Sequence, residues 1–113
     1  MKNNLPFLKH ISDETVFLTD KTNDIEFKAF SEDAVLKRAC TRSFEIIGEA
    51  VKNLSVEFKN KHKDIDWRKI AGMRDKIIHF YFGVDYDILW KTIKDKIPVL
   101  KLKVEKLIKE TAD

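Results

Sequence analysis

The residues best suited to chemistry lie within eight positions, Arg74 to Tyr81. Arg74 supplies a permanent cation, His79 supplies an imidazole, and Asp75 and Tyr81 add a carboxylate and a phenol. A guanidinium binds phosphoryl oxygens and an imidazole moves protons, so this set suits chemistry on a phosphodiester. No other part of the chain offers a comparable set. Arg74, His79 and Asp75 are therefore our candidate catalytic residues.

Helical geometry constrains how these side chains can act together. On an unbroken helix, Asp75 and His79 form an i,i+4 pair, so the carboxylate can orient the imidazole. Arg74 and Tyr81 lie about 20° apart around such a helix, whereas Arg74 and His79 lie about 140° apart. Arg74 and His79 of one straight helix therefore cannot reach the same phosphate. Either the helix distorts near Gly72, or a second subunit completes the site.

The elements that must position these residues are helices. Hydrophobic periodicity predicts four of them, over residues 6–20, 31–58, 67–82 and 86–110. Ser31, Asp66 and Asp85 are the predicted N-caps of the last three helices, and Gly83 ends the third. Pro98 should kink the fourth helix or split it near residue 97. The sequence predicts an all-α, up-and-down four-helix bundle in a single domain over residues 1–113.

The second predicted helix carries an unusually wide apolar face. Its apolar and small residues span about 180°, compared with the roughly 100° that covers one side of a core. Part of this face should therefore meet a second chain, which favours a homodimer with a composite site. Cys40 lies within the face, so we expect a buried small hydrophobe rather than a reactive thiol.

Composition limits the function classes. Lys and Arg number 22 against 19 Asp and Glu, a net charge of +3 that is compatible with an RNA or nucleotide partner. The single cysteine permits no internal disulfide, so we expect a reducing, cytoplasmic location. We expect no membrane span or signal peptide, because no stretch is long and apolar enough. No Cys/His cluster or repeated Glu-x-x-His spacing predicts a metal, and no cofactor is expected.

Two segments, residues 44–54 and 65–85, resemble the HepT toxin family of the HEPN superfamily of helical RNases. The signature R-x(4)-H-x-Y is met by Arg74, His79 and Tyr81. The resemblance extends over about residues 30–100.

This chain departs from the family pattern at two places. Lys63-Asp64-Ile65 stands where many relatives have a proline before the Ile-x-Trp, and Phe80 fills a place often occupied by glycine. The residue directly after the arginine, often Asn in the family, is Asp75 here.

The resemblance implies a homodimer whose two motifs line a cleft at the interface. It also implies metal-independent RNA cleavage, in which the 2′-hydroxyl attacks the adjacent phosphate. The expected partner is an MNT-type nucleotidyltransferase antitoxin, which would use ATP to add AMP to Tyr81.

Two other hypotheses stay open. In one, the chain is a non-catalytic dimeric helical module that binds a nucleotide or a nucleotidyltransferase, with Arg74 holding a phosphate and His79 donating a hydrogen bond. In the other, the motif residues are structural and Tyr81 belongs to the core. A neighbouring reading frame for a nucleotidyltransferase would weaken the purely structural hypothesis.

Overall fold

The computed structural model describes residues 3–79 and 83–112. It confirms the all-α class: the described chain is a helical bundle with one two-stranded hairpin. The elements are α1 Leu5–Thr22, α2 Phe27–Glu32, α3 Ala34–Asn53, α4 Val56–Lys61, α5 Trp67–Ile77, β1 Ile78–His79, β2 Gly83–Val84, α6 Tyr86–Asp95 and α7 Ile97–Ala112. Within the described residues, no helix is both long enough and apolar enough to span a bilayer.

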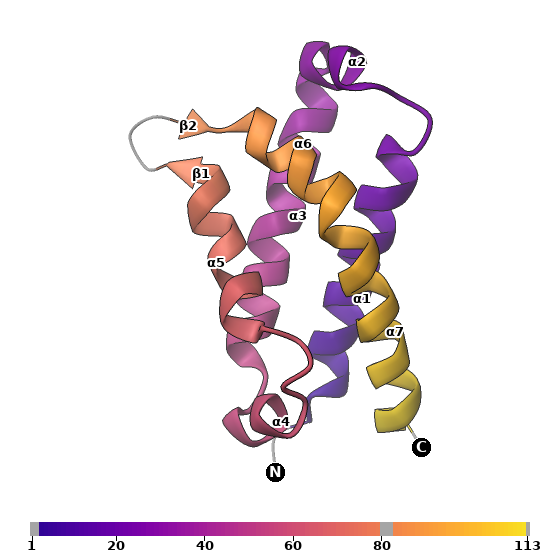
Figure 1. The fold of residues 1–113 in the computed structure, drawn as a ribbon, viewed down its shortest axis with the longest axis vertical. Coiled ribbons are helices and arrows are strands. Elements are labelled where there is room, and N and C mark those ends of the chain that lie inside the picture. Colours follow the sequence, from indigo (N-terminus) through magenta and orange to yellow (C-terminus); the bar gives the residue numbers. More distant parts are fainter. Residues whose placement is uncertain (1–2, 80–82, 113) are drawn as a thin grey trace.

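The bundle has four sides. Three are the helices α1, α3 and α5, and the fourth is formed by α6 and α7, which follow each other along the chain (Figure 1). α3 packs against α1 on one side and against α5 on the other, and α7 returns to pack against α1. α4 lies at the end where α1 begins, whereas the β1–β2 hairpin and α2 lie toward the opposite end. α5 thus runs beside α3 from the α4 end to the hairpin.

The core lies between these helices and includes much of α3. Phe44, Ile47 and Val51 are buried there, together with Cys40, whose exposed fraction is 0%. Burial, reinforced by the charge of Asp33, raises the pKa of the Cys40 thiol to about 11. The prediction that Cys40 is a buried small hydrophobe is confirmed.

Two of the three predicted helix caps are confirmed. The Asp66 carboxylate accepts from the backbone N–H of Lys69, and Asp85 accepts from that of Ile88, both at 3.1 Å. The prediction for Ser31 was wrong, because Ser31 lies inside α2. Asp33 caps α3 instead, accepting from a backbone N–H one turn later.

The second predicted helix, residues 31–58, is shorter than expected. α3 ends at Asn53, and Leu54 adopts an extended conformation. Ser55 then caps the separate helix α4, accepting from the Phe58 N–H at 3.1 Å. A strong cap beyond Leu54 thus divides the apolar run, and the predicted split of the fourth helix near Pro98 is confirmed by the boundary between α6 and α7.

The third predicted helix, residues 67–82, ends five residues early, at Ile77. His79 instead pairs with Gly83 in an antiparallel hairpin, and the Asp85 N–H donates to the Ile77 carbonyl at 2.7 Å. β-Branched and aromatic residues favour strands, and Gly83 adopts a φ of 81° that suits glycine. The geometry expected for an unbroken helix therefore does not apply to His79. Tyr81 and Phe80 lie outside the described residues.

The wide apolar face of α3 is largely covered within the chain itself. α1 and α5 pack against α3, and seven α3 residues are buried. Val35, at one end of that face, is 79% exposed, so part of the face is left uncovered by this chain and the homodimer stays a prediction.

Candidate functional site

A polar groove of about 300 Å³ lies between α3 and α5, and we call it the Arg74 groove. The two helices approach closely at its floor: a Cβ added to Gly48 would lie 3.6 Å from the Ala71 carbonyl oxygen and 3.8 Å from the Arg74 Cβ. The remaining lining residues are charged: Arg42, Glu45, Glu49, Lys52, Arg74 and Asp75. Close packing of two helices therefore brings charged side chains from distant parts of the sequence together.

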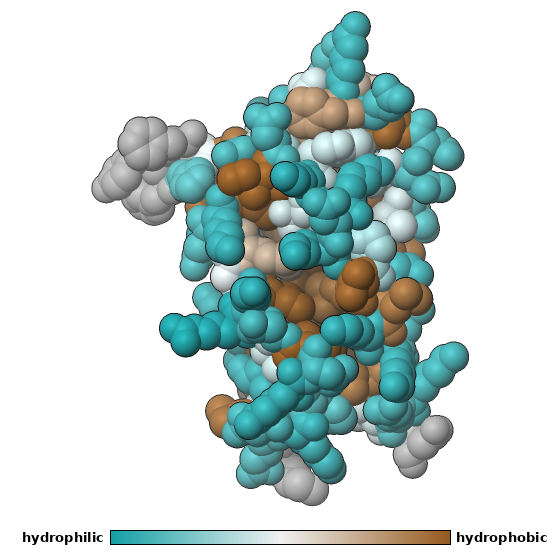
Figure 2. Space-filling model, in the orientation of Figure 1, coloured by the Kyte–Doolittle hydropathy of each residue, from teal (hydrophilic) through white to brown (hydrophobic). Residues whose placement is uncertain are grey.

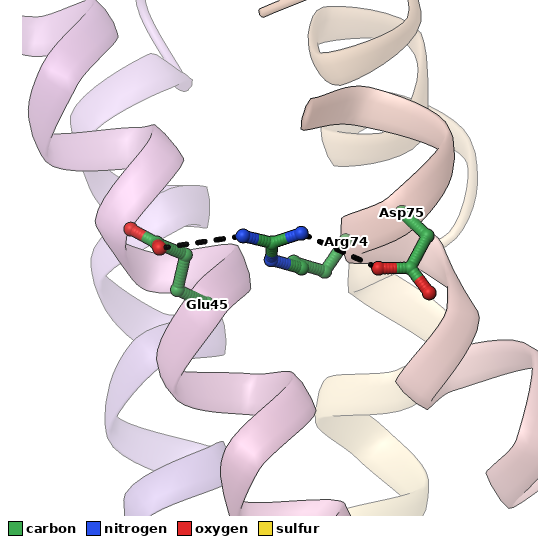
Figure 3. Close-up of polar contacts among 3 residues, drawn as sticks. All are labelled: Glu45, Arg74 and Asp75. Carbon is green, nitrogen blue, oxygen red and sulfur yellow. Dashed lines mark hydrogen bonds and ion pairs between the residues drawn. The ribbon is translucent and has the colours of Figure 1, made fainter. Parts of the chain in front are cut away.

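Arg74 reaches across this groove from α5 toward α3 (Figure 3). Its Nη2 lies 4.0 Å from Oε2 of Glu45, and its Nη1 lies 3.4 Å from Oδ1 of Asp75. The side chain of Arg74 is 41% exposed, so solvent and a ligand can reach the guanidinium. Both contacts are long for ion pairs, so they orient Arg74 without locking it.

Asp75 lies beside Arg74 rather than one helical turn from His79. Its carboxylate contacts the guanidinium at the C-terminal end of α5, where a cation is also favoured by the helix dipole. Because α5 ends at Ile77, the predicted i,i+4 pairing of Asp75 with His79 does not form on a helix. The structure therefore brings two of the candidate residues together and gives Asp75 a different partner.

His79 lies just beyond α5, in the first strand of the hairpin. It is exposed, and it is not among the residues that line the Arg74 groove. Within one chain, Arg74 and His79 thus lie at neighbouring but separate places. The predicted position of Tyr81 falls outside the described residues.

Glu45 is the site residue that sequence reasoning missed. It lies on α3, 29 positions before Arg74, so the sequence does not reveal their contact. A weaker signal is present: Arg42, Glu45, Glu49 and Lys52 recur at spacings of three and four, which gives one charged stripe on α3. That stripe marks a helix face which is polar although it lies beside α5.

The Arg74 groove is balanced in charge. Three cations and three acids line it, so it is not a general anion-binding surface. Among residues 3–79 and 83–112, no group of three His, Cys, Asp or Glu side chains is arranged to hold a metal ion. The chemistry available to the described groove is that of a positioned guanidinium and its carboxylate neighbours.

A second hollow, of about 450 Å³, opens between α5 and the α6–α7 pair. Ile70, Met73 and Val99 line it, and Figure 2 shows hydrophobic side chains on this face flanked by hydrophilic ones. Both lysines and aspartates surround it, and neither Arg74 nor His79 does. It therefore belongs to a different face from the candidate site.

Fold and site together define a small helical protein with an arginine in a groove between two helices and a histidine just beyond. Comparison with protein families matches residues 11–107 to the family described as "Ribonuclease HepT-like". The chain belongs to this HepT-like ribonuclease family, of the HEPN type.

Individual relatives agree with that assignment. The chain is 51% identical to "Putative RNase TTE0752" of Caldanaerobacter subterraneus subsp. tengcongensis, covering 97% of this chain and 98% of that protein. It is 48% identical to "Probable ribonuclease HepT" of Thermococcus cleftensis, covering 91% and 94%. It is 41% identical to "Putative RNase MJ0127" of Methanocaldococcus jannaschii, covering 92% and 86%. No solved structure gives a significant match.

Proposed function

We propose that this protein is an endoribonuclease that needs no metal and acts through Arg74 and His79. The observation that carries the proposal is the accessible guanidinium of Arg74, positioned across the α3–α5 groove by Glu45 and Asp75. Membership of a ribonuclease family and relatives named as RNases support the reaction class.

In the proposed reaction, a ribose 2′-hydroxyl of the RNA attacks the adjacent phosphorus. The bond from phosphorus to the 5′-oxygen of the next nucleotide breaks, which leaves a 2′,3′-cyclic phosphate and a 5′-hydroxyl. His79 accepts the proton of the 2′-hydroxyl or donates one to the leaving oxygen, and water carries out the other proton transfer. Arg74 stabilises the negative charge that grows on the phosphoryl oxygens. Asp75 acts as a positioning residue for Arg74, its partner in the structure.

A homodimer would let Arg74 and His79 act on one phosphate. Within one chain His79 does not line the Arg74 groove, so apposed copies could place the histidine of one beside the arginine of the other. The proposal predicts a dimer at micromolar concentration by light scattering. A monomer that cleaves RNA at full rate would remove the composite site from the mechanism.

RNA cleavage by the purified chain tests the proposed function directly. We expect products ending in cyclic phosphate, and we expect the rate to persist in EDTA, because no step of the mechanism uses a metal. A rate that EDTA abolishes and Mg²⁺ restores would contradict the mechanism. An unchanged RNA would favour the alternative, a binding module, which the charge balance around Arg74 also permits.

We further propose that the protein is the toxin of a toxin–antitoxin pair and that a nucleotidyltransferase partner neutralises it. The partner would transfer AMP from ATP to the Tyr81 hydroxyl and release pyrophosphate. Each phosphodiester adds a negative charge two residues beyond His79, which would repel RNA and compete for Arg74. The support is the motif R-x(4)-H-x-Y together with the family.

Intact mass tests this modification. After incubation of the pair with ATP and Mg²⁺, we expect the mass to rise by whole AMP units, and we expect Tyr81→Phe to stay unshifted. A shift that persists in Tyr81→Phe would exclude Tyr81. Induction of the chain with and without its partner, followed by inspection of growth and cellular RNA, tests the toxin role.

A further inference from the structure

A second groove continues from the Arg74 groove along the line where α3 and α5 meet. It has a volume of about 530 Å³, and Lys52 and Ala71 line both grooves. On α3, Lys52 follows Glu45 by seven residues, which places it on the same face about 10 Å farther along the helix. We call this 530 Å³ groove the basic groove.

Cations dominate the rim of the basic groove. The positively charged lining residues are Lys52, Lys59, Lys63 and Arg68, whereas Asp66 is the one acid that lines it. The Asp66 carboxylate already accepts from the Lys69 N–H as the cap of α5. Positive charge therefore outnumbers negative charge four to one around this groove, in contrast to the balance around Arg74.

None of the four cations has an ion-pair partner among the described residues, and three of them, Lys52, Lys63 and Arg68, also make no side-chain hydrogen bond there. All three are exposed. The fourth, Lys59, donates from Nζ to the Val51 carbonyl at the end of α3, so it has a structural role. Clustered, exposed and uncompensated cations favour a polyanion as the ligand.

The floor of the basic groove is apolar. Val51, Ile65 and Trp67 line it, and Trp67 is held in place because its Nε1–H donates to the His62 carbonyl at 3.0 Å. Single-stranded nucleic acid combines charged phosphates with flat, partly apolar bases and sugars. Because Val51, Ile65 and Trp67 are only 2% to 6% exposed, the cationic rim supplies most of the contact with such a strand.

We infer that the basic groove binds a single-stranded stretch of the RNA substrate, a few nucleotides away from the phosphate that is cleaved. This inference rests on the proposed function, because it takes the bound strand to be the RNA that is cleaved in the Arg74 groove. The two grooves join directly. It makes Lys63 and Arg68 substrate-binding residues that touch RNA outside the reacting bond. RNA long enough to reach both grooves should then be preferred over a short fragment.

The variant K63Q/R68Q tests this inference, because both residues line the basic groove and neither lines the Arg74 groove. The matched control is K106Q/K109Q, which removes the same charge from exposed positions on α7. Two readouts are measured for each protein. One is the ratio of kcat/KM for a 12-nucleotide RNA to that for a trinucleotide, and the other is the salt dependence of binding to a non-cleavable 2′-O-methyl 12-mer.

We expect K63Q/R68Q to lose the preference for the long RNA. The negative slope of log K against log salt should become shallower by about 1.4, for two lost phosphate contacts. The control should keep the wild-type ratio and slope. Equal losses in both variants, an unchanged slope in K63Q/R68Q, or competition by polyglutamate as strong as by RNA would overturn the inference. A further outcome is a wild type that binds the 12-mer with a salt dependence steeper than that of K63Q/R68Q and yet cleaves no RNA. That result would contradict the proposed function and still support RNA binding in the basic groove.

Discussion

Two grooves along the same pair of helices differ in the balance of the charges that line them. In the Arg74 groove, carboxylates from α3 and α5 flank the arginine, and the charges balance. In the basic groove, Lys52, Lys63 and Arg68 have no ion-pair partner among the described residues. A guanidinium that must act at one atom needs orientation, whereas a surface that holds a flexible polyanion gains from free charge. The difference suggests chemistry in one groove and substrate binding in the other.

The largest effect should follow loss of Arg74 or His79. We expect His79→Ala to lower the rate of RNA cleavage by about 10²–10⁴-fold, the range typical of a lost proton-transfer group, and Arg74→Ala to lower it by about 10²–10³-fold, the range typical of a lost donor to a developing oxyanion. Because both residues are at least partly exposed, stability should change by only about 0.5 kcal/mol. Cleavage rates under single-turnover conditions measure the effect.

Controls for these variants are available in the same chain. Arg38→Ala and His10→Ala remove exposed residues of the same types that line neither groove. Cys40 provides a check of folding, because a buried thiol with its pKa raised to about 11 should resist alkylation at pH 8 in every intact variant. Wild-type cleavage by His79→Ala would remove His79 from the mechanism.

Glu45→Gln should have a smaller effect than loss of Arg74 or His79. It should strengthen RNA binding and slow cleavage. This change removes a carboxylate that competes with RNA for the Arg74 guanidinium, so we expect RNA to bind up to about fivefold more tightly, since an exposed ion pair is worth at most about 1 kcal/mol. The cleavage rate of bound RNA should fall, because Arg74 loses one of its two orienting partners.

Binding titrations and single-turnover rates separate the two effects of Glu45→Gln. The control is Glu57→Gln, an exposed acid on α4 that lines neither groove. If Glu45→Gln and Glu57→Gln behave alike, the contact between Glu45 and Arg74 has no part in the site, and the contrast between the two grooves is weaker.

Local features of this fold could be predicted from the sequence, and features that depend on tertiary pairing could not. The caps Asp66 and Asp85 and the break before Pro98 depend on neighbouring residues, and all three predictions are confirmed. The end of α5 depends instead on pairing between β1 and β2, which helical periodicity cannot reveal. The segment around His79 was therefore predicted as helix.

The same limit applies to the candidate site. Residue types identified Arg74, His79 and Asp75, but the partner of Arg74 from α3 follows from packing at Gly48, far away in the sequence. The apolar width of α3 was a real signal, yet α1 and α5 account for most of it. Amphipathic width alone does not say whether the covering surface comes from the same chain.

The smallest expected effect should appear when the helix caps Asp66 and Asp85 are removed one at a time and the two variants are compared. Asp66→Ala removes the cap of α5 and also the one acid that lines the basic groove, whereas Asp85→Ala removes a cap that lines neither groove. Each should cost about 1 kcal/mol of stability, measured by thermal or urea unfolding, because each carboxylate accepts one backbone N–H.

RNA binding should separate these two matched variants. With the acid gone, the basic groove keeps four cations and no lining carboxylate, so Asp66→Ala should bind a single-stranded 12-mer about twofold more tightly at low salt, and the gain should disappear as salt screens the rim. Asp85→Ala should bind as the wild type does. If both caps cost the same stability and neither changes RNA affinity, electrostatics in the basic groove do not contribute to binding, and the distinction between the grooves would rest on shape alone.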